Sequence, residues 1–98
     1  MDDFTARQID RMKSLCEMAI LRKVDPSKFV RDQWALIDMV KATNESLWEE
    51  YRSIVNQVEI TIAIALDEKG QLEESDLLSI EQAVGKAKDF IARVQNQH

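Results

Sequence analysis

Few side chains in this chain have the types and spacing that catalysis or metal binding requires. The only histidine is His98, the last residue, and a chain end is poorly placed to hold an imidazole as a base or a metal ligand. The sequence contains no Glu-x-x-His pair of the kind that holds metal ions inside a helical bundle. Gly70 and Gly85 are isolated, so no glycine-rich phosphate loop is formed. We therefore expect no catalytic residue, no metal site and no cofactor.

The single cysteine and the two tryptophans are expected to pack rather than react. Cys16 lies between Met12 and Ile20 on an apolar stripe, where a thiol behaves as a small buried hydrophobe. A lone cysteine also forms no disulfide within its own chain. Trp34 and Trp48 are suited to stacking on nucleobases, but an acidic chain without a basic groove offers nucleic acid little attraction. Packing in the core or at its edge is the expected role of both.

Acidic side chains gather between residues 45 and 81. The chain has a formal net charge of −5, and this segment holds ten acids against Arg52 and Lys69. That balance argues against direct nucleic-acid binding, which depends on clustered Lys and Arg. The acids around the turn at Gly70 are Asp67, Glu68, Glu73, Glu74 and Asp76. They are either solvated acids that cap a helix or a surface that imitates phosphates and meets a basic protein.

A second candidate surface is uncharged. On the helix expected to end near residue 68, one strip lies opposite the main apolar stripe and consists of Ser53, Asn56, Gln57, Ile60 and Ile64. Ile60 and Ile64 are one helical turn apart, so they are neighbours. Either this helix is central and packs on both sides, or the strip is a partner or dimer surface with an aliphatic centre and an amide rim.

The first two helices are expected over residues 5–22 and 25–42, from apolar residues that recur at helical spacing. Thr5 and Gln8 have the spacing of a capping box, and Phe4 and Ile9 that of a hydrophobic staple. The second helix begins with an Asp-Pro pair at residues 25–26, a strong N-terminal signal. Its inward face contains one polar residue at position 33, a glutamine.

The last two helices are expected from residues 43–46 to 68 and from about residue 73 to 94. Glu49 and Glu50 near the start of the third favour the positive end of its dipole, and a glycine at position 70 supplies its stop. Its stripe is the strongest in the chain: Leu47, Tyr51, Ile54, Val55, Val58, Ile62, Ala65 and Leu66. In the fourth helix Gly85, beside Ala83 and Ala87, is expected to let a neighbouring helix approach closely.

These elements predict an all-α fold and one domain over residues 1–98. Short connections favour an up-down-up-down antiparallel four-helix bundle, with a three-helix core and a loosely docked first helix as the alternative. In the bundle the first and third turns share an end, so Arg22, Lys23 and Lys69 relieve the acidic edge there. The acidic N-terminus does not resemble a secretory signal, and the longest apolar run is too short to span a bilayer, which favours a cytoplasmic protein.

Three segments carry a resemblance to a known family: LRKVDPSKFVRDQW, the amphipathic LWEEYRSIVNQVEITIAIAL, and the turn DEKGQLEESDLL before the last helix. Over residues 15–94 their layout resembles the small helical immunity proteins that protect bacteria from colicin-D-like and contact-dependent-inhibition nuclease toxins. The resemblance implies a four-helix bundle that binds its toxin tightly. It also implies that acids such as those of DEKGQLEESD and WEE cover the toxin active site where RNA phosphates would bind.

The functional prediction is a non-catalytic, protein-binding module, monomeric or weakly dimeric. Its partner is expected to be a basic nuclease toxin domain rather than nucleic acid or a membrane. The candidate contact residues are Asp67, Glu68, Glu73, Glu74, Asp76, Glu49, Glu50, Ile60 and Ile64. The alternative is a small secretion chaperone, adaptor or phage-encoded inhibitor that presents the apolar face around Ile60 and Ile64.

Overall fold

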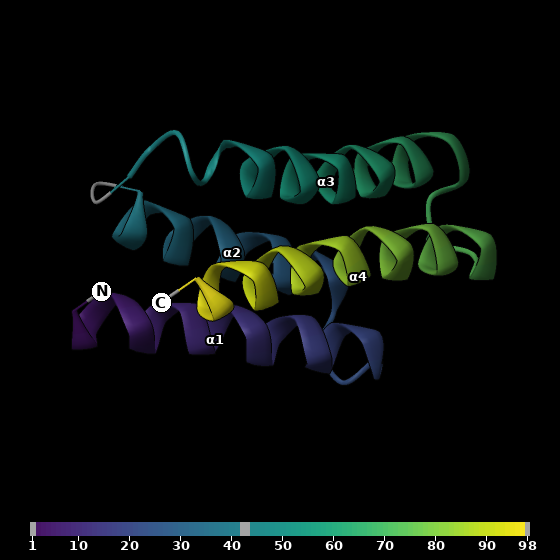
Figure 1. Cartoon of the computed structure of the whole chain (residues 1–98). Coiled ribbons are helices and arrows are strands. Elements are labelled where there is room, and N and C mark those ends of the chain that lie inside the picture. Colours follow the sequence, from purple (N-terminus) through teal and green to yellow (C-terminus); the bar gives the residue numbers. More distant parts are fainter. Residues whose placement is uncertain (1, 42–43, 98) are drawn as a thin grey trace.

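The computed structural model describes residues 2–41 and 44–97 (Figure 1). It contains α1 (Asp3–Ile20), α2 (Pro26–Val40), α3 (Glu49–Lys69) and α4 (Glu74–Asn96), and none of the described residues lies in a strand. The prediction of an all-α chain with four helices is confirmed. The predicted roles of residues 42, 43 and 98 lie outside the described residues.

Each helix packs against two others: α1 and α3 both contact α2 and α4. Figure 1 shows the α1–α2 and α3–α4 turns at one end of the molecule, and the start of α1 and the end of α4 at the other. This arrangement is consistent with an up-down-up-down bundle. α1 buries Ile9, Met12 and Cys16 almost completely, so it is a full member of the core rather than a loosely docked helix.

Two helix starts have the predicted side-chain caps. The Asp25 carboxylate accepts a hydrogen bond from the Ser27 backbone N–H at 2.8 Å, and Pro26 opens α2. At α4, Glu73 is the N-cap and forms a capping box with Asp76, whose carboxylate accepts the Glu73 N–H at 2.8 Å. These caps satisfy backbone donors that the first helical turn would otherwise leave unpaired.

The start of α1 differs from the prediction. Asp2 is the N-cap, and its carboxylate accepts the Thr5 backbone N–H at 2.7 Å. Thr5 and Gln8 therefore lie inside the helix and are buried, so the predicted capping box is wrong. Phe4 is half-exposed within the first turn and does not precede a cap as a staple residue must. The reason is that aspartate is preferred over threonine as an N-cap, and Asp2 lies three residues before Thr5.

α3 begins later than predicted, at Glu49, and ends as predicted. The Asn44 side chain accepts the Leu47 backbone N–H at 3.2 Å, which shapes a turn that brings the nearly fully buried Trp48 into the core. At the other end Gly70 has φ 75°, and its N–H donates back into the last turn. Glycine is favoured at this left-handed position because it lacks a Cβ.

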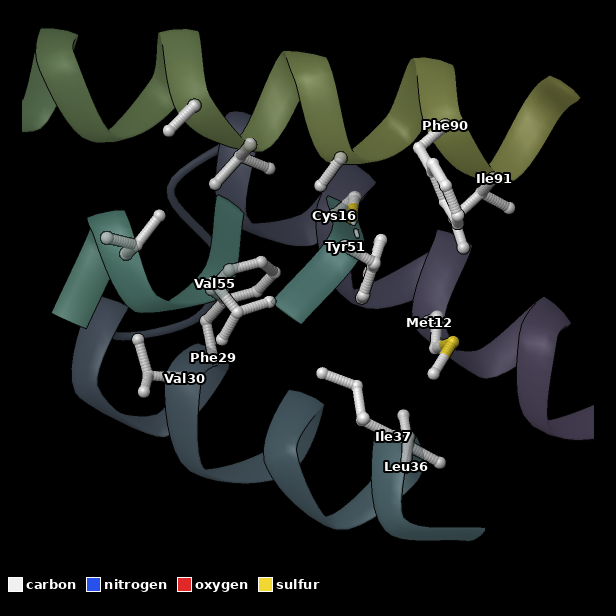
Figure 2. Close-up of a cluster of buried hydrophobic side chains, with 14 of the residues drawn as sticks. Met12, Cys16, Phe29, Val30, Leu36, Ile37, Tyr51, Val55, Phe90 and Ile91 are labelled. Atoms are coloured by element: carbon white, nitrogen blue, oxygen red, sulfur yellow. Dashed lines mark hydrogen bonds between the residues drawn. The ribbon is translucent and has the colours of Figure 1, made fainter. Parts of the chain in front are cut away.

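One apolar core joins all four helices (Figure 2). Three of its aromatic members, Trp48, Tyr51 and Phe90, have ring centroids 5.5–5.7 Å apart, a favourable range for aromatic pairs. The predicted stripe of α3 buries Tyr51, Val55, Val58, Ile62 and Ala65. Leu66, at the margin of that stripe, is 46% exposed and does not belong to the core as predicted.

A buried hydrogen-bond network crosses this core. The Gln33 side chain donates to the Met12 carbonyl at 3.0 Å and accepts the Tyr51 hydroxyl proton at 2.8 Å. The Cys16 sulfur lies 3.6 Å from the same hydroxyl. Burial raises the pKa of the Cys16 thiol to about 11, so the thiol stays protonated near neutral pH. The prediction that Cys16 packs in the core is confirmed.

We expect Tyr51→Phe to lower the free energy of unfolding by about 1–3 kcal/mol, because the Gln33 carbonyl oxygen would be buried without a donor. Urea denaturation followed by circular dichroism measures the loss. The double variant Gln33→Leu with Tyr51→Phe should lose less than Tyr51→Phe alone, since it removes both polar groups. Equal stability of Tyr51→Phe and wild type would show that the hydroxyl does not satisfy the amide.

Gly85 has more room than the sequence indicated. A Cβ built at Gly85 meets nothing within 4 Å, so the predicted close approach of a helix there is wrong, although Ala83 and Ala87 are buried.

We expect Gly85→Ala to raise the free energy of unfolding by up to about 1 kcal/mol through helix propensity. Gly70→Ala is the matched control with equal space, and it should destabilise because of its positive φ. Thermal melts of both variants test this difference. A change in melting temperature of the same sign in both variants would contradict it.

Candidate protein-binding surface

The turn after α1 holds an arginine in a position usually taken by glycine. Arg22 has φ 58°, the only positive φ among the described residues other than glycine. Its N–H donates to the Ala19 carbonyl at 3.1 Å, and the Lys23 N–H donates to the Met18 carbonyl at 2.8 Å. This is the Schellman pattern of helix termination. A non-glycine residue there indicates that its side chain is used.

The Arg22 side chain connects this turn to α4. Its guanidinium lies 2.6 Å from the Glu74 carboxylate and 2.8 Å from that of Glu81. The hydrogen bonds that Arg22 donates to Glu74 and, second in size, to Glu81 raise the pKa of Arg22, and Arg22 in turn holds the pKa of Glu74 below its ordinary value. The first and third turns therefore share an end, as predicted, and Arg22 neutralises part of the acidic edge there.

Lys69 neutralises a second part of the edge. Its ammonium lies 2.6 Å from the Asp76 carboxylate and 4.0 Å from that of Glu73. Of the predicted acid cluster, Glu73, Glu74 and Asp76 are thus engaged within the chain. Asp67 and Glu68 form no ion pair with a described residue and are exposed. Among the described ion pairs, Asp67 and Glu68 are therefore the two acids of the cluster that no base of the chain neutralises.

The pairing of Asp76 predicts a pH dependence. The hydrogen bond from Lys69, followed by that of the Glu73 N–H, lowers the pKa of Asp76 in the folded state. Its contribution to stability is therefore present above the unfolded pKa of about 4 and is lost as the pH falls through the lower folded value. Asp76→Asn should be less stable than wild type at about pH 7, and the difference should shrink towards about pH 3. Chemical denaturation at both pH values tests this, and a difference that does not change with pH would contradict it.

The uncharged strip on α3 is exposed. Ile60 and Ile64 are 49% and 52% exposed, and Ser53, Asn56 and Gln57 are exposed as well. The interpretation that α3 packs on both sides is wrong, because the helix has only α2 and α4 as close neighbours. We define the outer face of α3 as Glu49, Ser53, Asn56, Gln57, Ile60, Ile64, Asp67 and Glu68.

The two predicted surfaces meet on this outer face of α3. Asp67 follows Ile64 by three residues and Ile60 by seven, which places all three on one side of the helix. Glu49 lies at the other end of the face, whereas the predicted contact residue Glu50 is held by Arg93 at 2.6 Å. The outer face therefore has an aliphatic centre, an amide region and acidic ends, and none of its members is basic.

A depression adjoins the outer face of α3 on the side of α2. It has a volume of about 420 Å³ and is lined by Trp34, Glu49, Arg52, Ser53 and Asn56. Trp34 is partly buried against the core, and its indole N–H donates to the Glu59 carboxylate at 3.1 Å. The predicted packing roles are confirmed for both tryptophans, with Trp48 in the core and Trp34 at its edge.

A groove between α1 and α2 was not predicted from the sequence. It has a volume of about 410 Å³ and is lined by Arg11, Ser14, Leu15, Met18, Asp32, Ala35 and Leu36. The signal that could have indicated it is Leu15 and Met18, which widen the apolar stripe of α1 beyond what α2 covers. The small side chain of Ala35 leaves the space open.

Comparisons of the chain with protein-family models, with curated proteins and with solved structures find no significant match. Within residues 2–41 and 44–97, no group of three or more His, Cys, Asp or Glu side chains is placed to hold a metal ion. In the same part of the chain, no helix has the length and apolar character needed to cross a membrane.

Proposed function

We propose that this chain is a non-catalytic protein-binding module, an up-down-up-down antiparallel four-helix bundle that contacts its partner through the outer face of α3. The observation that carries the proposal is the exposure of Ile60 and Ile64, one turn apart, on a face without basic residues. Aliphatic side chains bordered by amides are suited to the centre of a protein interface. The depression beside Trp34 offers room for a side chain of the partner.

The partner that this face fits best is a basic protein. Glu49 lies at one end, and Asp67 and Glu68 lie at the other, and none of the three forms an ion pair with a described residue. Complementary charge speeds association and selects the partner. A cytoplasmic immunity protein that covers the active site of a bacterial nuclease toxin would use such a surface. Glu73, Glu74 and Asp76 would contribute only after exchanging Arg22 and Lys69 for basic groups of the toxin.

A second candidate function is that of a secretion chaperone, adaptor or phage-encoded inhibitor. It would use Ile60, Ile64 and the depression beside Trp34, and the acidic ends would have no role. The same exposed isoleucines favour it. Salt dependence separates the two functions, because ion pairs at the rim of an interface are screened over about 8–10 Å at ordinary ionic strength, whereas apolar contacts are not.

The test uses the purified product of the neighbouring gene, since an immunity gene adjoins that of its toxin. We expect Asp67→Lys with Glu68→Lys to slow association at least about tenfold and to reduce its salt dependence, because favourable steering becomes repulsion. The matched control is Glu17→Lys with Asp89→Lys, which changes the net charge equally at two exposed acids of α1 and α4 that, like Asp67 and Glu68, form no ion pair with a described residue. Surface plasmon resonance measures both rates.

Ile60→Ser with Ile64→Ser should raise the dissociation rate while the thermal melt stays close to wild type, because both side chains are half-exposed. Binding that ignores salt and the lysine variants but depends on the isoleucines would assign the adaptor function. Binding that ignores both pairs would overturn the use of this face.

A further inference from the structure

The outer face of α3 is complementary to an inverted copy of itself. We propose that two copies of this chain pair through it, with α3 of one antiparallel to α3 of the other and the twofold axis level with Ile62. This homodimer is a separate proposal from the partner complex. Its test uses the chain alone, so its outcome does not depend on whether the proposed function is correct. Amide, apolar and acidic residues follow one another along α3 in the order that such a pair requires.

The apolar centre selects the register. With the axis level with Ile62, Ile60 of one copy lies opposite Ile64 of the second copy, and symmetry repeats the contact. The four isoleucine side chains, each about half-exposed in the single chain, then cover one another. A slip of one helical turn in either direction places an isoleucine opposite Asn56 or Glu68 instead. Only this antiparallel register pairs isoleucine with isoleucine throughout.

The polar residues favour the same register. Asp67 and Glu68 lie level with the amide pair Asn56 and Gln57 of the second copy. Amide N–H groups donate to carboxylates, so the acids meet donors rather than one another. A parallel pair would place Asp67 against Asp67 and Glu68 against Glu68, which is repulsive. The first half of the face lacks charge between residues 53 and 57, and this makes it complementary to the acidic second half.

The dimensions indicate a weak dimer. Residues 56–68 extend about 18 Å along the helix at 1.5 Å per residue. A single helix pair of that length buries less than the roughly 1,200–2,000 Å² of a standard interface. We therefore expect a dimer that dissociates on dilution, with a Kd between about 10 μM and about 1 mM.

Sedimentation equilibrium of the purified chain from about 5 μM to about 1 mM tests the dimer. The average mass should rise with concentration from that of the monomer towards that of the dimer, and Ile60→Ser with Ile64→Ser should remain monomeric with an unchanged thermal melt. Leu78→Ser is the matched control, because Leu78 is 51% exposed on α4 and lies outside the face. A wild-type chain that is monomeric throughout, or dimers that Leu78→Ser disrupts equally, would overturn the proposal.

Salt dependence and cross-linking test the antiparallel register of the two α3 helices. Raising NaCl from about 50 mM to about 500 mM should leave the dimer unchanged or tighter, since its register joins no opposite charges. A dimer that salt dissociates would overturn the proposed register.

In a mixture of Gln57→Cys and Asp67→Cys chains, a short bismaleimide should join mainly unlike chains, and wild type with buried Cys16 is the control. Predominant Gln57→Cys homodimers would overturn the antiparallel register, because it separates those two positions by about 15 Å along the axis.

Discussion

The hydrogen bonds of Gln33 impose the strictest requirement on the packing of this chain. An amide with no exposure to water must find both a donor and an acceptor inside the core, and it finds them on α1 and α3. Apolar contacts tolerate small shifts of one helix along another, whereas hydrogen-bond geometry does not. The amide therefore sets the register of three helices at once, with α4 packed against α1 and α3 by apolar contacts and the Phe90 ring.

This packing determines which surfaces stay open. Because α3 turns Tyr51 and the residues in line with it towards Gln33, the opposite side of the helix faces outward with Ile60 and Ile64. The same arrangement brings the first and third turns together, where Arg22 and Lys69 engage four acids. The binding face proposed for this protein is therefore a consequence of how the buried hydrogen bonds of the core are formed. The acids that have no ion pair within the chain lie on that face.

Local signals predicted much of the fold. The Asp-Pro start of α2 and the glycine at the end of α3 depend only on adjacent residues and backbone conformation, and both were identified correctly. The start of α1 was not, because the capping-box spacing of Thr5 and Gln8 competes with Asp2, although aspartate is the preferred cap residue. Helical periodicity identifies an apolar stripe but not the number of helices that pack against it. The sequence therefore did not decide whether Ile60 is exposed or buried.

The candidate site was harder to predict than the fold, because long-range pairing decides which acids are available. Arg22 and Glu74 are 52 residues apart in the chain, and nothing in either local sequence indicates their contact. The groove beside Met18 depends likewise on which side chains of α1 and α2 come together.

The left-handed backbone of Arg22 has a consequence for cooperativity. An L-residue in this conformation is strained in any state that keeps the turn, but the compensating bonds to α4 exist only when both ends of the chain have assembled. A partly folded form with α1 and α2 paired and α4 detached would retain the strain without the bonds. Such a form is disfavoured, so the bundle should open as one unit rather than shed its last helix, and amide hydrogen exchange should be similarly slow in the cores of α1 and α4.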